Sequence, residues 1–294
     1  MLTQRVDDID VIRDAMEVPG LGALAINAFV LHADQPVLVD TGRPVEREAF
    51  LTALESVINP ADIRWIWLTH PDRDHMGALF DVLALAPHAR LVTTFIAAGY
   101  LSVEYPVPFE RVQIVNPGQS LEVGRGRSLH AFRPPLFDSP MTVGLLDDGI
   151  GTCISSDCFG GLLPSVEAAY ADDVADLDSG AVRAGQTAWA MADSPWVTSI
   201  DPAKFARTYT GLRHFAPRRI MSTHLPPATG QLPAFLELLE TVPDTQPMDP
   251  PDQAFLDTIL REAFGEPAHP PATPRDLVTA ESSPAALRRS ADGT

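Results

Sequence analysis

The sequence predicts an α/β fold in which two β-sheets pack face to face and helices cover their outer faces, a four-layer αββα sandwich. Apolar runs typical of strands cluster early in each half of the 294-residue chain, and segments with helical spacing follow them. Proline and glycine divide the chain into short elements, and the second half repeats the coarse strand-then-helix order of the first.

The first half alternates strands and helices. Apolar runs at 24–32 and 36–39, with a break of hairpin length between them, predict two strands. Residues 45–58 have helical spacing, because Phe50, Leu54 and Val57 fall on one face. The remaining elements expected here are a strand at 64–68, a helix at 77–85, a strand at 91–94 and a helix at 95–101.

The second half begins again with short strands between Gly, Pro and Asn breaks. The strands expected here are 111–115, 120–123, 128–132, 141–146, 152–156 and 219–222. A helical region is expected from about 165 to 192, and another helix at 231–240. Residues 202–215 read as one helix, with Asp201 as its N-cap and proline in its first turn.

The composition restricts the partners. Lys and Arg number 21 against 39 Asp and Glu, a net charge of −18, which repels phosphate backbones and anionic lipid. We therefore expect a small-molecule substrate, with neither nucleic acid nor a membrane as partner. The two cysteines exclude a disulfide framework, and the chain has neither an apolar signal core nor a membrane-spanning run. These features predict a cytoplasmic protein.

The chain is expected to form one domain over residues 1–242 and a proline-rich tail over 243–294. Within the tail, residues 252–264 have an apolar face at helical spacing, and the segment from about Pro267 onward has no apolar period. This helix either packs on its own domain or joins two copies of the chain as a homo-oligomer.

Four metal-ligand side chains lie within six residues: His70, Asp72, Asp74 and His75. They directly follow the apolar strand at 64–68, and strand ends are where α/β folds place their chemistry. Residues 70, 72 and 74 share one face if extended, and a helix start at 75 turns the last histidine toward them. The spacing suits two adjacent metal positions, His70 with Asp72 and Asp74 with His75.

The stretch Thr-His-Pro-Asp-Arg-Asp-His at 69–75 resembles the signature of the metallo-β-lactamase fold, whose usual form is His-x-His-x-Asp-His. Stretches at 38–42, 155–157 and 222–224 resemble other parts of that fold in the same order, so the resemblance covers about residues 20 to 230. It implies a metallo-β-lactamase-like sandwich in which Asp157 bridges two metals and His224 is the last ligand histidine. Asp40 and Thr69 are implied to support the ligands by hydrogen bonds.

Asp72 stands where the usual motif has its second histidine. An acidic residue there resembles the flavodiiron proteins and their shorter oxygen-binding diiron relatives, and residues 156–160 resemble their Ser-Asp-Ala-Phe-Gly stretch. A carboxylate makes the site harder, which favours Fe or Mn, although Zn can compete. One or two divalent ions are the only cofactors expected.

One ligand of the resembled motif is missing. Its middle histidine belongs near Pro135, and the nearest histidine is His130, which is a weaker candidate five residues upstream. One position then has a complete set, composed of Asp74, His75, His224 and the bridging Asp157. The other has His70, Asp72 and Asp157 and is one ligand short. The sequence therefore predicts one tightly held ion, or two held unequally.

The function favoured on these grounds is a metal-dependent hydrolase, since one complete metal position suffices to activate water near neutral pH. Asp74 would orient the nucleophile as its catalytic residue, and esters, lactones, thioesters and phosphoesters all suit this chemistry. The alternative is a diiron protein that binds or reduces O₂ or NO. Residues 243–294 are too few and too proline-rich for a flavodoxin-like domain, so no electron inlet is expected. A third alternative is a fold with only a structural metal or none.

Overall fold

The structure is a computed structural model that describes residues 1–264. The chain divides into one unit over Met1–Asp249, which holds both sheets, and a second over Pro250–Thr294, which begins with helix α9 (Gln253–Phe264). The expectations for residues beyond 264, including the segment from Pro267, lie outside the described residues. No helix among residues 1–264 combines the length and apolarity needed to cross a membrane.

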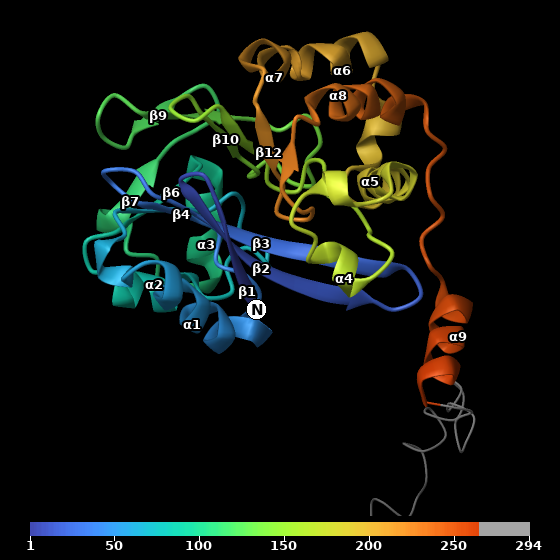
Figure 1. Ribbon diagram of the computed structural model, residues 1–294, viewed down its shortest axis with the longest axis horizontal. Coiled ribbons are helices and arrows are strands. Elements are labelled where there is room, and N and C mark those ends of the chain that lie inside the picture. Colours follow the sequence, from blue (N-terminus) through green and yellow to red (C-terminus); the bar gives the residue numbers. More distant parts are fainter. Residues whose placement is uncertain (265–294) are drawn as a thin grey trace, which may run out of the picture. The chain divides into compact units, whose positions relative to one another are not determined.

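The first sheet has seven strands in the spatial order β1 to β7 (Figure 1). Its strands are β1 (Leu2–Val6), β2 (Ile9–Val18), β3 (Gly22–Leu31), β4 (Val37–Val39), β5 (Trp65–Trp67), β6 (Arg90–Thr93) and β7 (Val112–Ile114). Neighbours from β1 to β4 are antiparallel, and β4 to β7 run parallel. Its helices are α1 (Arg47–Val57), α2 (Leu79–Leu85) and α3 (Phe95–Glu104).

The second sheet has six strands in the order β13-β12-β11-β10-β9-β8. Its strands are β8 (Ser120–Glu122), β9 (Ser128–Phe132), β10 (Gly144–Asp147), β11 (Thr152–Ile154), β12 (Arg219–Met221) and β13 (Ala228–Thr229). Only β11 and β12 are parallel neighbours among these described strands. Its helices are α4 (Val166–Ala169), α5 (Ser179–Asp193), α6 (Pro202–Thr208), α7 (Thr210–Phe215) and α8 (Leu232–Thr241).

Short 3₁₀ helices complete the connections. They are η1 (Pro44–Glu46), η2 (Pro60–Asp62), η3 (Phe109–Arg111), η4 (Val174–Asp176), η5 (Pro195–Ser199) and η6 (Val242–Asp244). Val242 and Pro243 of η6 are buried, and Val242 belongs to the core beneath α8. The packing of the first unit therefore continues past residue 242.

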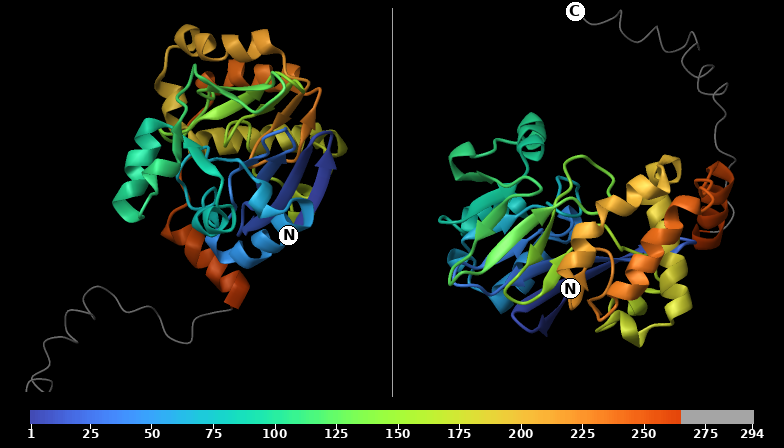
Figure 2. Two further views of the ribbon diagram at one scale, coloured as in Figure 1. Left: turned by 90° about the vertical axis from the view of Figure 1, so that its left-hand side faces the viewer. Right: turned by 90° about the horizontal axis from the view of Figure 1, so that it is seen from above.

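Three apolar clusters separate four layers, as the sequence predicts. Phe50 of α1 and Leu79 of α2 pack against the outer face of the first sheet. Phe29 and Trp67 meet strands β8 to β12 between the sheets. The third cluster joins the outer face of the second sheet to α5, α6, α7 and α8. The layers follow one another in Figures 1 and 2 from α1 and α2, through both sheets, to α6 and α8.

The structure adds three strands that the sequence did not predict, β1, β2 and the two-residue strand β13. The sequence of β2 lacks the apolar pattern of a strand, because the charged residues Asp10, Arg13 and Asp14 are buried within it. Each is paired: Asp10 with Arg5 at 2.8 Å, Asp14 with Arg43 at 2.7 Å, and Arg13 with Asp172 at 3.2 Å. Ion pairing offsets part of the free-energy cost of burying these charges. In the sequence, the same charged residues interrupt the apolar pattern by which a strand is recognised.

Two helix predictions were too long. The helical region at 165–192 is divided into α4, η4 and α5, and Asp178 caps the start of α5. The helix at 202–215 is two helices, because Tyr209 leaves the helical conformation between α6 and α7. The Tyr209 side chain is buried in the cluster that packs α6 and α7 against the second sheet.

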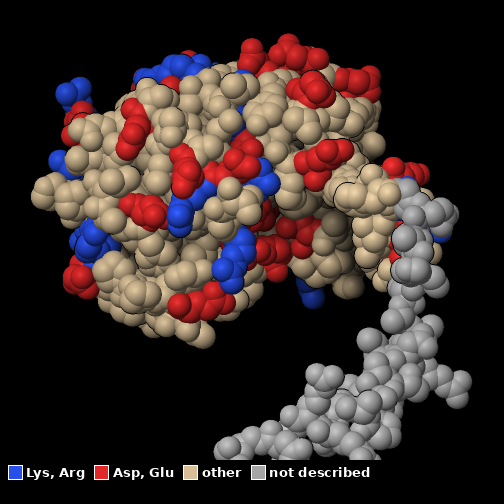
Figure 3. Space-filling view, turned by 90° about the horizontal axis from the view of Figure 1, so that it is seen from below, with Lys and Arg blue, Asp and Glu red and all other residues tan. Residues whose placement is uncertain are grey.

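The surface carries charges of both signs. On the face shown in Figure 3, Lys and Arg side chains are scattered among Asp and Glu. Acidic residues outnumber basic ones in the whole sequence, and the net charge is −18. Such a surface keeps the chain apart from polyanions unless a local basic site intervenes.

Candidate metal centre

The ends of two pairs of parallel strands bring the predicted site residues together. Asp40 follows β4, and Thr69 and His70 follow β5 in the first sheet. Asp157 follows β11, and His224 follows β12 in the second sheet. Because the carboxyl ends of parallel strands face the same way, side chains far apart in the sequence meet at one edge of the sandwich.

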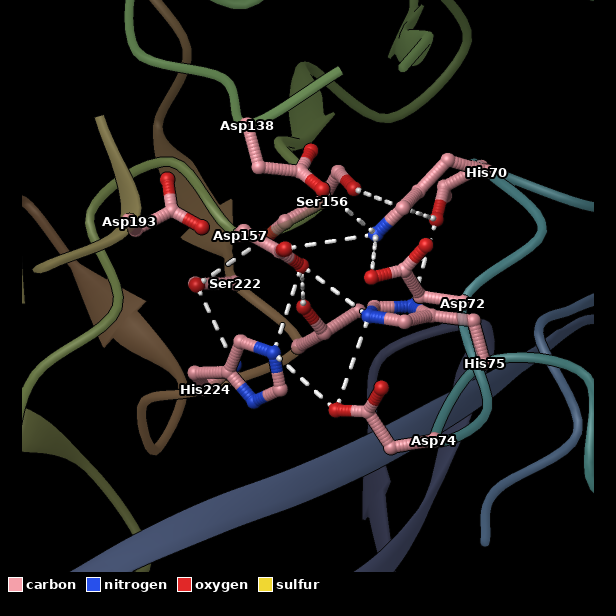
Figure 4. Close-up of polar contacts among 12 residues, drawn as sticks. His70, Asp72, Asp74, His75, Asp138, Ser156, Asp157, Asp193, Ser222 and His224 are labelled. Carbon is pink, nitrogen blue, oxygen red and sulfur yellow. Dashed lines mark hydrogen bonds and ion pairs between the residues drawn. The ribbon is translucent and has the colours of Figure 1, made fainter. Parts of the chain in front are cut away.

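Asp157 lies at the centre of this cluster (Figure 4). Its carboxylate oxygens are 3.4 Å from Nε2 of His70, 3.1 Å from Nε2 of His75 and 3.2 Å from Nε2 of His224. All four side chains are buried. Thr223 donates a hydrogen bond of 3.0 Å to Asp157 Oδ1, which fixes the carboxylate. A single carboxylate therefore faces three imidazole nitrogens.

Backbone and side-chain acceptors orient two of the histidines. Nδ1 of His75 donates to Asp40 Oδ2 at 2.9 Å, and Nδ1 of His224 donates to the carbonyl oxygen of Ala25 at 2.8 Å. In the neutral imidazole, a donating Nδ1 leaves the lone pair on Nε2. In that neutral form, both Nε2 atoms are available to bind a metal ion beside Asp157.

Asp40 and Thr69 support the cluster from behind. Asp40 accepts hydrogen bonds of 2.8 Å from the backbone N–H and from the hydroxyl of Thr69. Asp40 has a left-handed backbone with φ of 59°, which turns the chain sharply after β4. Its carboxylate is thereby fixed in direction before it meets His75.

Asp72 and Asp74 lie near different histidines of the cluster. Asp72 Oδ2 is 3.9 Å from His70 Nε2, and Asp72 is half-exposed. Asp74 Oδ2 is 3.5 Å from His224 Nε2 and 3.8 Å from His75 Nε2. Atoms of Asp74, His75 and His224 lie within 4.8 Å of one another. Asp72 therefore lies nearest to His70, and Asp74 lies nearest to His224 and His75.

Two further carboxylates belong to the cluster, and sequence reasoning missed both. Asp138 groups with His70 and Asp72, and Asp193, the last residue of α5, groups with Asp138 and Asp157. Asp138 lies in the stretch where a histidine was sought, so an acidic side chain in that loop was the available signal. No comparable signal marks Asp193, because the helix that carries it is distant in sequence.

His130 does not reach the cluster. Its Nδ1 is 2.8 Å from the hydroxyl of Ser120, and its Nε2 is 3.1 Å from Asp148, both at the surface. None of the clustered ligand groups among residues 1–264 includes it. Regular pairing of β9 with β8 and β10 places it there, without the bulge that a shift toward the cluster would need.

The charges in the cluster stabilise one another. Burial favours a raised pKa for Asp157, but His70, His75 and His224 reverse this and hold the pKa well below its usual range. Burial favours a lowered pKa for His75, but Asp157 and Asp40 raise the pKa well above the usual value. The pKa of His224 is also raised, because Asp157 outweighs its burial. The carboxylates thus favour positive charge at this edge of the sandwich.

The carboxylates of Asp72, Asp74 and Asp193, which surround Asp157, differ in the direction of their pKa shifts. Burial raises the pKa of Asp72, against the opposing charge of His70. Burial also favours a raised pKa for Asp74, but His75 and His224 outweigh it and lower the pKa. Burial, together with the nearby charge of Asp157, raises the pKa of Asp193 to about 7. Of these three carboxylates, only Asp74 has a lowered pKa.

The residues present fit divalent metal ions. Nε2 of His70 and Nε2 of His75 are buried and make no hydrogen bond of acceptable geometry among the described residues. Buried polar nitrogens without a partner are costly. Both point at carboxylate oxygens, and metal ions commonly join these two kinds of ligand.

The chain is similar in sequence to known proteins. Residues 24–183, more than half of the chain, match the family described as ODP family beta lactamase. Diflavin flavoprotein A 1 of Synechocystis sp. is 31% identical over 134 residues, which is 46% of this chain and 23% of that protein. The anaerobic nitric oxide reductase flavorubredoxin of Salmonella arizonae is 28% identical over 144 residues, 49% of this chain and 30% of that protein. The chain therefore matches less than a third of either relative's length.

Solved structures share the architecture. Rubredoxin oxygen:oxidoreductase from Desulfovibrio gigas superposes with a TM-score of 0.72 at 17% identity, over 84% of this chain and 63% of that one. A flavo di-iron protein variant from Thermotoga maritima superposes with a TM-score of 0.69 at 20% identity, over 82% of this chain and 60% of that one. At these identities the likeness is one of fold.

These comparisons correct the functional expectation. The prediction of a metal-dependent hydrolase, with Asp74 orienting a nucleophile, is wrong, because the matching proteins are named as flavoproteins, a nitric oxide reductase and an oxygen:oxidoreductase. The resemblance to flavodiiron proteins drawn from Asp72 and residues 156–160 is confirmed. The chain belongs to the ODP family of beta-lactamases, and its fold is similar to that of the flavodiiron structures.

Proposed function

We propose that this chain is a diiron protein that binds and reduces O₂ or NO. The observation that carries the proposal is the position of Asp157, whose carboxylate faces the Nε2 atoms of three buried histidines. A carboxylate so placed can bridge two ions, one on each side. Names of relatives that include nitric oxide reductase and oxygen:oxidoreductase support the choice of substrates.

Asp157 divides the proposed ligands into two sets. Asp74, His75 and His224 would hold one iron, and His70 and Asp72 would hold the other, with Asp157 shared. Carboxylate oxygens make up a large share of these donors, which suits iron better than a site of imidazoles alone. Bound iron would supply electrons to the gas and a position for it to bind.

The residues of the chain set the geometry for this chemistry. Asp40 and the carbonyl of Ala25 hold His75 and His224 in the orientation that presents Nε2. Thr223 holds Asp157 by a hydrogen bond. Because these supports are in place before any ligand binds, the donors need little reorganisation.

We also propose a route for the gas. A cavity of about 140 Å³ lies beside Asp72 and is lined by Pro71, Arg73, Met76, Tyr100, Leu101, Glu104 and Tyr105. Among the lining residues, Arg73 donates to Glu104 at 3.1 Å and to the hydroxyl of Tyr105 at 3.0 Å. This half-exposed side of the cluster suits a diatomic molecule, and the electrons would come from a flavin-containing redox protein.

Gas consumption by the iron-loaded protein tests the proposal. Metal-free protein is loaded anaerobically with ferrous iron, supplied with a chemical reductant and given NO or O₂ at an electrode. We expect sustained consumption of at least one gas, lost in Asp157→Asn. Asp148→Asn is the matched control, because Asp148 bonds His130 at the surface outside the cluster. A protein that holds two irons and consumes neither gas would contradict the proposal.

A further inference from the structure

We propose that Asp138 is a ligand of the metal position formed by His70 and Asp72. The inference rests on the proposed diiron function and completes it, because the sequence leaves that position one ligand short. The geometry points to a carboxylate from a different loop in place of the histidine that the motif lacks.

His70 gives the first reason. Its side chain is fully buried, and its Nε2 has no hydrogen-bond partner among the described residues. Asp157 Oδ2 lies 3.4 Å from this nitrogen, and Oδ2 atoms of Asp72 and Asp138 both lie 3.9 Å from it. Asp138 therefore stands in the same relation to His70 as Asp72, which the ligand motif includes.

The orientation of Asp138 gives the second reason. Its Oδ1 accepts a hydrogen bond of 3.0 Å from the Thr142 hydroxyl, while Oδ2 faces His70. Thr142 is fully buried, and the Arg133 guanidinium donates to the carbonyl oxygens of Ser139, Pro140 and Thr142. The loop that carries Asp138 is thus fixed, and one carboxylate oxygen accepts no hydrogen bond within residues 1–264.

With Asp138 included, the two proposed metal positions differ in their donor atoms. His70 contributes one nitrogen, and Asp72, Asp138 and Asp157 contribute carboxylate oxygens. The other position has two nitrogens, from His75 and His224, and two carboxylates. The first position is therefore the harder and more negative of the two, and it should discriminate more strongly in favour of iron or manganese over softer ions.

Asp193 supplies a matched control. It lies within 4.8 Å of Asp138 and Asp157, but its group includes no histidine, and its Oδ2 already accepts a hydrogen bond of 2.8 Å from Ser194. Asp193→Asn removes a carboxylate from the same cluster without removing a proposed ligand. Measured above pH 7, where Asp193 with its pKa of about 7 is mainly an anion, it separates the loss of a metal–oxygen bond from a general loss of negative charge.

The test counts metal ions and measures their affinity without reference to turnover. Parent, Asp138→Asn, Asp138→Ala and Asp193→Asn proteins are titrated with Mn(II) against a competing chelator, and bound Mn(II) is counted by electron paramagnetic resonance. We expect two ions in the parent and in Asp193→Asn. In both Asp138 variants one ion should remain tight, and the other should weaken by at least about 100-fold, as for the loss of a strong ligand contact.

Any other outcome contradicts the assignment of Asp138 as a metal ligand. Two ions at parental affinity in Asp138→Asn, which can keep the Thr142 hydrogen bond and the fold, overturn the role of Asp138 and leave the diiron function standing. Equal weakening in Asp193→Asn assigns the effect to charge and also overturns it. A parent that binds a single ion removes both the diiron function and the role of Asp138.

Discussion

The hydrogen bond from His75 to Asp40 is the most informative contact at the scale of single residues. Both side chains are buried, and Asp40 also receives two hydrogen bonds from Thr69. The carboxylate fixes the imidazole ring and raises its basicity, which strengthens it as a ligand. The same arrangement occurs away from the cluster, where Asp10 contacts His32 at 2.6 Å.

Asp40→Asn should weaken metal binding by roughly 10–100-fold, because it removes the negative acceptor behind His75. Asp10→Asn is the matched control and should leave metal affinity unchanged. Competition against a chromogenic chelator measures both. Equal metal affinity in parent and Asp40→Asn would show that the Asp40 contact is structural.

The stability of the metal-free protein should depend on pH in a defined direction. The pKa values of His75 and His224 are raised, so their contribution is complete below about pH 6.5 and is lost as pH rises through the folded-state values. The pKa of Asp157 is lowered, so its contribution is present above about pH 4 and is lost as pH falls through the folded-state value.

Urea unfolding of metal-free protein between about pH 5 and pH 9 measures this dependence. We expect the free energy of unfolding to fall toward alkaline pH, and to fall less in Asp157→Asn, which lacks the main partner charge. Metal affinity should change in the opposite direction, because binding displaces protons from the histidines. A free energy of unfolding that rises toward alkaline pH in the parent would refute this account.

At the scale of elements, the turn after β11 depends on close packing at Gly160. An added Cβ there would lie 2.8 Å from Cβ of His224 and 2.8 Å from Nε1 of Trp189. Trp189 of α5 also donates to the carbonyl oxygen of Asp157 at 3.2 Å. Gly160 therefore allows α5, the turn and the strand-end histidine to meet.

Gly160→Ala should lower the free energy of unfolding by about 1–3 kcal/mol, the usual cost of overpacking, and should reduce metal affinity by displacing His224. Gly99→Ala is the control, because no atom lies within 4 Å of a Cβ added at that position in α3. The control should stabilise the protein by about 0.5–1 kcal/mol. Chemical denaturation measures the free energy of unfolding of both variants. Equal changes in the two variants would contradict the packing argument.

Elements could be predicted from the sequence when one residue pattern was dominant. The apolar strand at 64–68 and the ligand motif after it were recognisable, because burial and ligand chemistry each leave a dense local pattern. Strand β2 was missed, because its buried charges Asp10, Arg13 and Asp14 pair with residues on other elements. The break at Tyr209 also has no proline or glycine at that position to mark it, and this residue is buried in the core.

At the scale of the whole molecule, the cluster belongs to the first unit alone. Each side chain in the clustered groups of the described residues falls within Met1–Asp249. For Asp138 the sequence offered only its place in the stretch where a histidine was sought, and the folded chain puts its carboxylate 3.9 Å from His70. Helix α9 has Leu256, Leu260 and Phe264 exposed, and its assignment to an oligomer contact stays a prediction.

Removal of residues 250–294 should therefore leave metal content and the stability of the first unit unchanged. If α9 joins two copies of the chain, the truncated protein should also have a lower oligomeric mass by light scattering. Elemental analysis and thermal unfolding provide the comparison with the full chain. Loss of metal from the truncated protein would show that the second unit contributes to the cluster.

The central claim is that Asp157 joins two iron sites in one chain, and Mössbauer spectroscopy of protein loaded with isotopically enriched iron tests it most directly. We predict two iron sites in equal amounts, magnetically coupled in the oxidised protein, and a single uncoupled iron at most in Asp157→Asn. Two uncoupled irons in the parent, or one iron per chain at saturation, would contradict the account.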